Sequence, residues 1–186
     1  MNRLRKYLRC WVILVAGLLL VGPGFALLPL NAARADEPVP LVALAAKKVG
    51  VRACLPAIED LAEKNSKGAT SQNIVVNWNR KTPDRSPFFS MTALGGGSEH
   101  AILSITAMPL GRGGCAVMVQ RVFTSTESCS LVAQRQLSDF VGGPLINGVL
   151  VYNSPSRPEE TYTLMQDGSS CTVIYRNAIP HWAHPR

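Results

Sequence analysis

The 186 residues include nineteen Lys and Arg and twelve Asp and Glu, a formal net charge of +7. Five of the basic residues, and none of the acidic ones, precede Asp36, so fourteen basic residues face twelve acidic ones beyond that point, a net charge of +2. So small a charge excludes the basic footprint of a nucleic-acid-binding protein and of a protein held by charge on anionic lipid.

Residues 1–35 have the pattern of a secretory signal peptide. Basic residues lead into an uncharged apolar stretch at 10–22, and Ala33 and Ala35 supply the small side chains that a signal peptidase recognises. We therefore expect cleavage before Asp36, and a periplasmic or secreted product with no transmembrane segment.

Retention of this segment as a membrane anchor is the alternative. Residues 10–30 are long enough to cross about 30 Å of hydrocarbon. Pro23 follows the apolar stretch directly, however, and proline is costly inside a helix. Cleavage is the favoured interpretation, and residues 36–40, with two prolines, are expected to form a flexible leader.

Residues 41–178 are expected to form one domain, which begins with helical spacing of its apolar residues. The spacing predicts two helical pieces, or one helix that kinks at Pro56, and Gly68 as the stop. The predicted buried stripes are Leu41, Leu44 and Ala45, then Leu55, Ile58, Leu61 and Ala62.

Beyond Thr70 the pattern is typical of strands separated by turns rich in glycine and proline. The predicted strands are 74–78, 88–94, 101–108, 116–123, 145–152, 161–166 and 171–176. Residues 128–140 fit a helix capped by Ser128, or a strand. The two prolines of residues 179–186 predict a frayed tail.

These elements predict an α+β fold, in which an N-terminal helical segment packs on an antiparallel sheet of about six or seven strands. A mostly-β sandwich is the alternative if the first helix is short. No internal repeat is visible in the sequence.

Four cysteines follow the signal: Cys54, Cys115, Cys129 and Cys171. An even number in an exported chain predicts two disulfides, and no close pair has metal-site spacing. If residues 116–123 form a straight strand, Cys115 and Cys129 are too far apart to form a disulfide. Of the two remaining pairings, Cys54–Cys129 with Cys115–Cys171 is preferred over Cys54–Cys115 with Cys129–Cys171.

His100 is the one candidate for catalysis, because Ser98 lies two residues before it. Nucleophilic catalysis needs the base within hydrogen-bond reach of the hydroxyl and a third group that orients the base. A polar turn between two strands explains the same residues, so catalysis is the minor hypothesis and no catalytic residue is assigned.

His181 and His184 are weak candidates for metal ligands, together with His100. Pro180 and Pro185 argue against a helix that would hold the two tail imidazoles on one face. A metal site usually needs three or four ligands in fixed positions, so neither a metal nor another cofactor is expected.

The leading functional hypothesis is therefore an exported, disulfide-stabilised, non-catalytic envelope protein that acts as a small binding or accessory domain. Its expected partner is another envelope protein, or a component of the wall or membrane. The alternatives are a small secreted hydrolase that uses His100 with Ser98 or a nearby carboxylate, and a metal-binding protein that uses its histidine-containing tail.

Overall fold

The computed structural model describes residues 40–96, 99–111 and 114–182. All of them belong to one compact unit, Glu37–Arg186. The signal segment, the leader up to residue 39, Ser98 and His184 lie outside the described residues.

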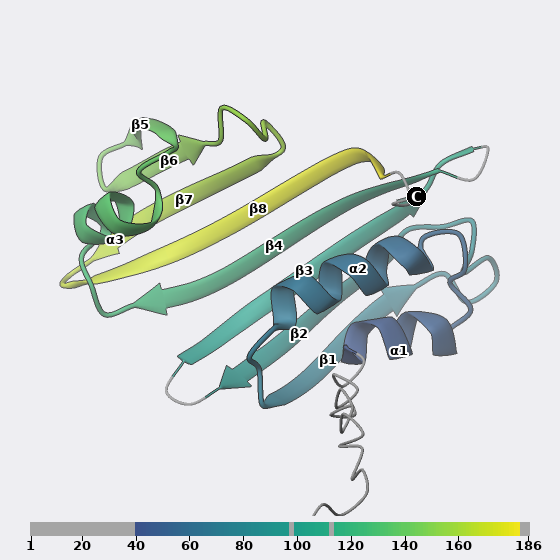
Figure 1. Ribbon diagram of the computed structural model, residues 1–186. Coiled ribbons are helices and arrows are strands. Elements are labelled where there is room, and N and C mark those ends of the chain that lie inside the picture. The colour runs from purple at the N-terminus through teal and green to yellow at the C-terminus, as the bar shows by residue number, and fades with distance from the viewer. Residues whose placement is uncertain (1–39, 97–98, 112–113, 183–186) are drawn as a thin grey trace, which may run out of the picture. The chain divides into compact units, whose positions relative to one another are not determined.

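The described residues form three helices and one antiparallel sheet of eight strands, with the strand order β1-β2-β3-β4-β8-β7-β6-β5 (Figure 1). The helices are α1 (Leu41–Lys48), α2 (Leu55–Ser66) and α3 (Cys129–Gln136). The strands are β1 (Ser71–Trp78), β2 (Phe88–Gly96), β3 (Glu99–Pro109), β4 (Cys115–Ser125), β5 (Val141–Ile146), β6 (Val149–Asn153), β7 (Glu160–Asp167) and β8 (Ser170–Trp182). The α+β class is confirmed, but the sheet has eight strands rather than six or seven, and it is a single sheet rather than a sandwich.

The eighth strand arises because residues 145–152, predicted as one strand, fold back on themselves. Asn147-Gly148 makes the turn between β5 and β6, and Gly148 has a positive φ of 78°. Asn-Gly between apolar runs is the strongest local signal for a hairpin. Pro144 is tolerated in β5 because that strand is an edge of the sheet.

The prediction that the tail is frayed from Ile179 onward is wrong for residues 179–182. This segment is the end of β8 and pairs with the start of β4, where the register shifts between Cys115 and Val117. The shift lies opposite Pro180, which has no N–H to donate to a regular ladder.

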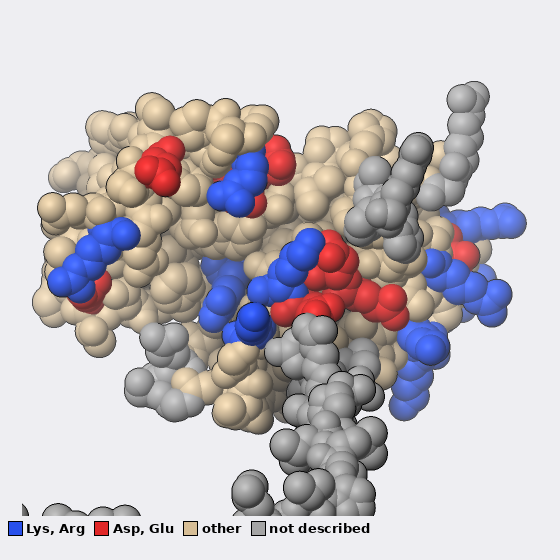
Figure 2. Space-filling view, in the orientation of Figure 1, with Lys and Arg blue, Asp and Glu red and all other residues tan. Residues whose placement is uncertain are grey.

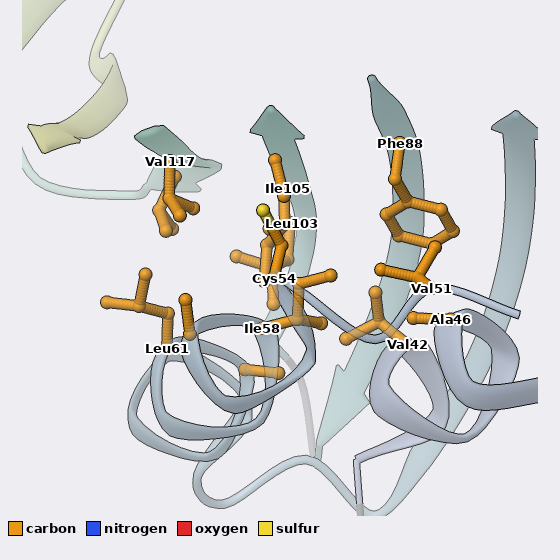
Figure 3. Close-up of a cluster of buried hydrophobic side chains, with 14 of the residues drawn as sticks. Val42, Ala46, Val51, Cys54, Ile58, Leu61, Phe88, Leu103, Ile105 and Val117 are labelled. Carbon is orange, nitrogen blue, oxygen red and sulfur yellow. The ribbon is translucent and has the colours of Figure 1, made fainter. Parts of the chain in front are cut away.

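Helices α1 and α2 cover β1–β4 through a continuous apolar core (Figure 3). On α2 the buried side chains Ile58, Leu61 and Ala62 follow the predicted stripe. On α1 the prediction is wrong: Val42 is among the buried residues, whereas Leu44 is 49% exposed. The sheet contributes alternate residues, such as the four buried positions Phe88, Ser90, Thr92 and Leu94 of β2.

The sheet consists of two halves with the same architecture. In the N-terminal half α2 precedes the four-stranded meander β1–β4, and in the C-terminal half α3 precedes the meander β5–β8. The halves join where β4 pairs with β8, and Phe123 packs against the apolar cores of both. Ser128 caps α3 by accepting a hydrogen bond from the backbone N–H of Leu131, so the helical interpretation of residues 128–140 is the right one for 129–136.

Each half carries one disulfide. Cys54 bonds Cys115, with 5.4 Å between the Cα atoms, and Cys129 bonds Cys171, with 4.9 Å. The preferred pairing is therefore wrong, and the alternative pairing is the one found. Cys115 and Cys171 cannot meet, because they lie at opposite ends of the antiparallel β4–β8 ladder: Cys115 pairs with Trp182, and Cys171 with Ser125.

Candidate ligand-binding cleft

The catalytic candidate His100 lies on β3 opposite Gly95 of β2, and its side chain is exposed. By the alternation of β3 it shares a face with Ile102, the face without helices. Within the described ranges, its ring makes no hydrogen bond to a hydroxyl or a carboxylate. The hydroxyl of Ser71, on the far side of Gly95, donates to the Gly95 carbonyl at 3.4 Å instead.

His100 and His181, the two proposed metal ligands among the described residues, are not brought together. His181 lies at the end of β8 that pairs with Cys115, whereas His100 lies near Phe123, because Ala101 pairs with Phe123. The intervening part of β4 is roughly 26 Å long at about 3.3 Å per residue. No group of three or more His, Cys, Asp or Glu side chains arranged to hold a metal occurs among the described residues.

The structure instead shows a cleft between the C-terminal ends of α2 and α3, with β4, β8 and β7 as its floor. Its volume is about 360 Å³. It is lined by Asn65, Arg121, Phe123, Gln136, Arg157, Glu160, Tyr162 and Tyr175. A pocket of about 130 Å³ shares two of these residues, Arg121 and Phe123, and is also lined by Lys67 and by the catalytic candidate His100.

The cleft floor forms where the inward-facing positions of β4 change from apolar to polar. On β4 the inward series runs Cys115, Val117, Val119 and then Arg121. On β8, Cys171 and Val173 are likewise followed by Tyr175 and Asn177. Because β4 and β8 pair in this region, the polar side chains of both strands lie under the gap between the two helical layers.

Arg121 supplies the floor of the cleft with a positive charge that is incompletely neutralised. Its guanidinium lies 5.6 Å from the centre of the Phe123 ring. Its Nε is buried and has no hydrogen-bond partner among the described residues, and the same holds for Oδ1 of Asn177. An unsatisfied buried donor costs about 1–3 kcal/mol, so a ligand that accepts this hydrogen bond would recover part of that cost.

At the rim of the cleft, the second guanidinium is already paired with a carboxylate. Arg157 Nη2 lies 3.1 Å from Glu160 Oε2, and the Arg157 side chain is largely exposed. Arg121, Arg157 and Glu160 together give the lining a net charge of +1. The cleft therefore favours an anionic group, and Arg121, which forms no ion pair within the described part of the chain, lies at its floor.

Two tyrosines form the aromatic side of the cleft. The rings of Tyr162 and Tyr175 lie 5.1 Å apart, and Phe140 meets Tyr162 edge-on at 5.2 Å. Burial, with a smaller contribution from Glu160, raises the pKa of Tyr175 to about 12 and also raises the pKa of Tyr162. Both phenols are therefore neutral hydrogen-bond donors at ordinary pH.

The fold and the cleft define a small disulfide-bonded α+β domain with a polar cavity of ligand size. Searches of family models, of curated proteins and of solved structures returned no match to this chain. None of the helices in the described part of the chain is long and apolar enough to span a membrane.

Proposed function

We propose that the protein is an exported, non-catalytic binding domain of the cell envelope, and that its cleft binds a small group bearing a carboxylate. The observation that carries this proposal is the Arg121 guanidinium at the cleft floor, whose buried Nε has no partner among the described residues. A carboxylate is planar, carries two acceptor oxygens and matches the guanidinium fork.

The size and lining of the cavity support a binding role. A volume of about 360 Å³ lies within the range of about 300–1,000 Å³ typical of small-molecule sites. Phe123, Tyr162 and Tyr175 provide apolar contact area, and Asn65 and Gln136 provide amides on opposite sides. A few polar groups among aromatic side chains are typical of a site that orients its ligand.

The two disulfides support export, because such bonds persist in oxidising compartments and are rare where thiols are kept reduced. The signal-peptide pattern of residues 1–35 points the same way. A carboxylate in this setting is supplied by the C-terminus of a short peptide, either from a wall component or from a partner protein.

A non-catalytic role agrees with the state of the carboxylate at the rim. Glu160 lies in an ion pair with Arg157, so its carboxylate is already engaged. The hydrolase and the metal-binding alternatives rest on His100 and His181, which lie at different ends of the sheet. His181 does not line this cleft, and His100 lines only the smaller pocket that shares Arg121 and Phe123 with it.

A peptide titration followed by amide NMR tests the proposal. The probes are N-acetylated dipeptides with a free C-terminal carboxylate and the same dipeptides with a C-terminal amide. We expect the free acids to shift the signals of residues around Arg121 and Tyr175, and the amides to bind at least tenfold more weakly.

Arg121→Gln should abolish the difference between acid and amide. Arg176→Gln is the matched control, because Arg176 is exposed, pairs with the neighbouring residue Gln120 and faces the other side of the sheet. Equal shifts by acids and amides, or an equal effect of the two substitutions, would overturn the proposal.

A further inference from the structure

The smaller pocket beside the cleft has the size of a branch of the cleft rather than of a separate site. Its volume is about 130 Å³, well below the ~300 Å³ at which small-molecule sites begin. It meets the cleft at Arg121 and Phe123, which line both spaces. We call this space, lined by residues 67–69, 94–96, 100–101, Arg121 and Phe123, the side pocket.

The end of β2 and the loop that follows α2 shape the side pocket. A Cβ on Gly96 would lie 2.8 Å from the carbonyl oxygen of Gly68, closer than real Cβ atoms approach other atoms. Only glycine, which has no Cβ, therefore lets the strand end and the loop come so near to each other. This close approach places Lys67, the residue before Gly68, at the side pocket.

The side pocket is more positive than the cleft. Lys67 and Arg121 line it and no acidic side chain of the described residues does, so its lining carries a charge of +2, against +1 for the cleft. Lys67 and Arg121 form no ion pair with any residue that the structure describes. Figure 2 shows Lys and Arg side chains gathered near the left end of α2, and Asp and Glu side chains along that helix.

We infer that the ligand carries a second carboxylate, which enters the side pocket, and that the ligand class is a peptide whose C-terminal residue has an acidic side chain. This inference rests on the proposed function, because the C-terminal carboxylate itself has to bind at Arg121 in the cleft. Three basic residues and one acidic residue line the two spaces together, a net charge of +2. One carboxylate leaves half of that charge unmatched, whereas two carboxylates neutralise it.

The offset between the two spaces suits one residue with two carboxylates. The floor of the cleft comes from β4, β8 and β7, and the side pocket lies over β4, β3 and β2, so the two are displaced across the sheet from each other. Neighbouring strands are about 4.8 Å apart. The two carboxylates of a C-terminal glutamate are separated by three carbons, which span about one such spacing. The flexible stem of Lys67 lets its ammonium follow the second carboxylate.

Four dipeptides test the inference separately from the proposed function. They are N-acetyl-alanyl-glutamate and N-acetyl-alanyl-glutamine, each as the free acid and as the C-terminal amide. In calorimetric titrations of the disulfide-bonded protein, we expect the glutamate acid to bind about fivefold more tightly than the glutamine acid, a size set by the exposure of Lys67. The difference should shrink in about 0.5 M NaCl, because salt screens exposed charges.

Lys67→Gln should remove the preference for glutamate over glutamine and leave the preference for acid over amide unchanged. Its side chain is exposed, so the fold of this variant should survive. Lys64→Gln is the matched control, because Lys64 lies one turn earlier on α2, pairs with Asp60 and lines neither space. It should keep both preferences.

The outcomes separate the two claims. Equal binding of the two acids, with acids still preferred over amides, overturns this inference and leaves the proposed function standing. Equal binding of acids and amides overturns the proposed function, and this inference with it. A preference for glutamate that survives Lys67→Gln, or that Lys64→Gln removes to the same extent, also overturns the inference.

Discussion

Arg121 on β4 and Tyr175 on β8 are direct cross-strand partners where the two halves of the sheet join. Both face the cleft between α2 and α3. The pairing places a guanidinium whose Nε is unpartnered among the described residues beside a phenol that stays protonated, so the cleft floor combines a positive charge with a neutral donor.

The raised pKa of Tyr175 predicts a loss of stability in alkali. The pKa is about 12 in the folded chain and 10.0 for an ordinary tyrosine, so the folded state binds the proton more tightly than the unfolded state. This contribution to the free energy of unfolding is complete below pH 10 and is lost as the pH rises towards 12. Urea denaturation at pH 9, 10 and 11 should show the decline, and Tyr175→Phe should reduce its slope. An unchanged slope in the variant would contradict the prediction.

Asp84 predicts a loss of stability in acid. Its Oδ1 accepts hydrogen bonds from the backbone N–H groups of Ala53, at 2.6 Å, and Arg52, at 2.7 Å, and these bonds lower its pKa from 3.8. The resulting stability is present above pH 3.8 and is lost as the pH falls through the lower, folded-state pKa. Asp84→Asn should cost about 1 kcal/mol at pH 7 in urea denaturation, and the difference from wild type should disappear in strong acid. Asp139→Asn, at an exposed position, should change little at either pH.

Removing either disulfide should lower the stability of the protein, independently of the other. The bonded cysteines are 61 and 42 residues apart, and chain-entropy estimates give about 4 kcal/mol for each loop. The double variants Cys54→Ser/Cys115→Ser and Cys129→Ser/Cys171→Ser should each lower the free energy of unfolding by an amount of this order. Peptide mapping without reduction checks the pairing, and a Cys54–Cys129 peptide would show that it is wrong.

The neighbouring glycines of β5 predict opposite responses to alanine. A Cβ on Gly142 would lie 2.2 Å from the Tyr152 ring, whereas a Cβ on Gly143 would meet nothing within 4 Å. Gly142→Ala should therefore cost about 1–3 kcal/mol through overpacking. Gly143→Ala should be neutral or slightly stabilising, because it reduces the freedom of the unfolded chain. Thermal unfolding of the two variants decides the matter, and similar melting temperatures would contradict the expected packing of Tyr152.

The parts of the fold that local sequence specifies could be predicted. The helical spacing of Ile58, Leu61 and Ala62 predicts the buried face of α2. Ser128 predicts the start of α3 in one of the two interpretations, helix or strand, that the sequence leaves open for residues 128–140. The hairpin at Asn147-Gly148 was missed although its signal is local. On α1, eight residues are too few for the apolar spacing to distinguish Val42 from Leu44 as the buried side chain.

The features that depend on the β4–β8 pairing could not be predicted in the same way. The extension of β8 to Trp182 and the choice between the two disulfide pairings both follow from that long-range ladder. The cleft was missed for the same reason, because its lining comes from positions as far apart as Asn65 and Tyr175. One local signal did exist: Arg121 interrupts an inward-facing apolar series of its strand.

Strand β8, the last described strand, lies in the middle of the sheet, between β4 and β7. Because the chain is made from its N-terminus, the parts of the sheet must form in a fixed order. As the chain is made from its N-terminus, β1–β4 and Cys54–Cys115 can close before β8 exists, since Cys115 precedes β8 by more than fifty residues. Until β8 arrives, β4 is an unpaired edge, which invites pairing with another chain. Cys171 lies at the start of β8, so the second covalent closure can follow only when that edge is about to be covered.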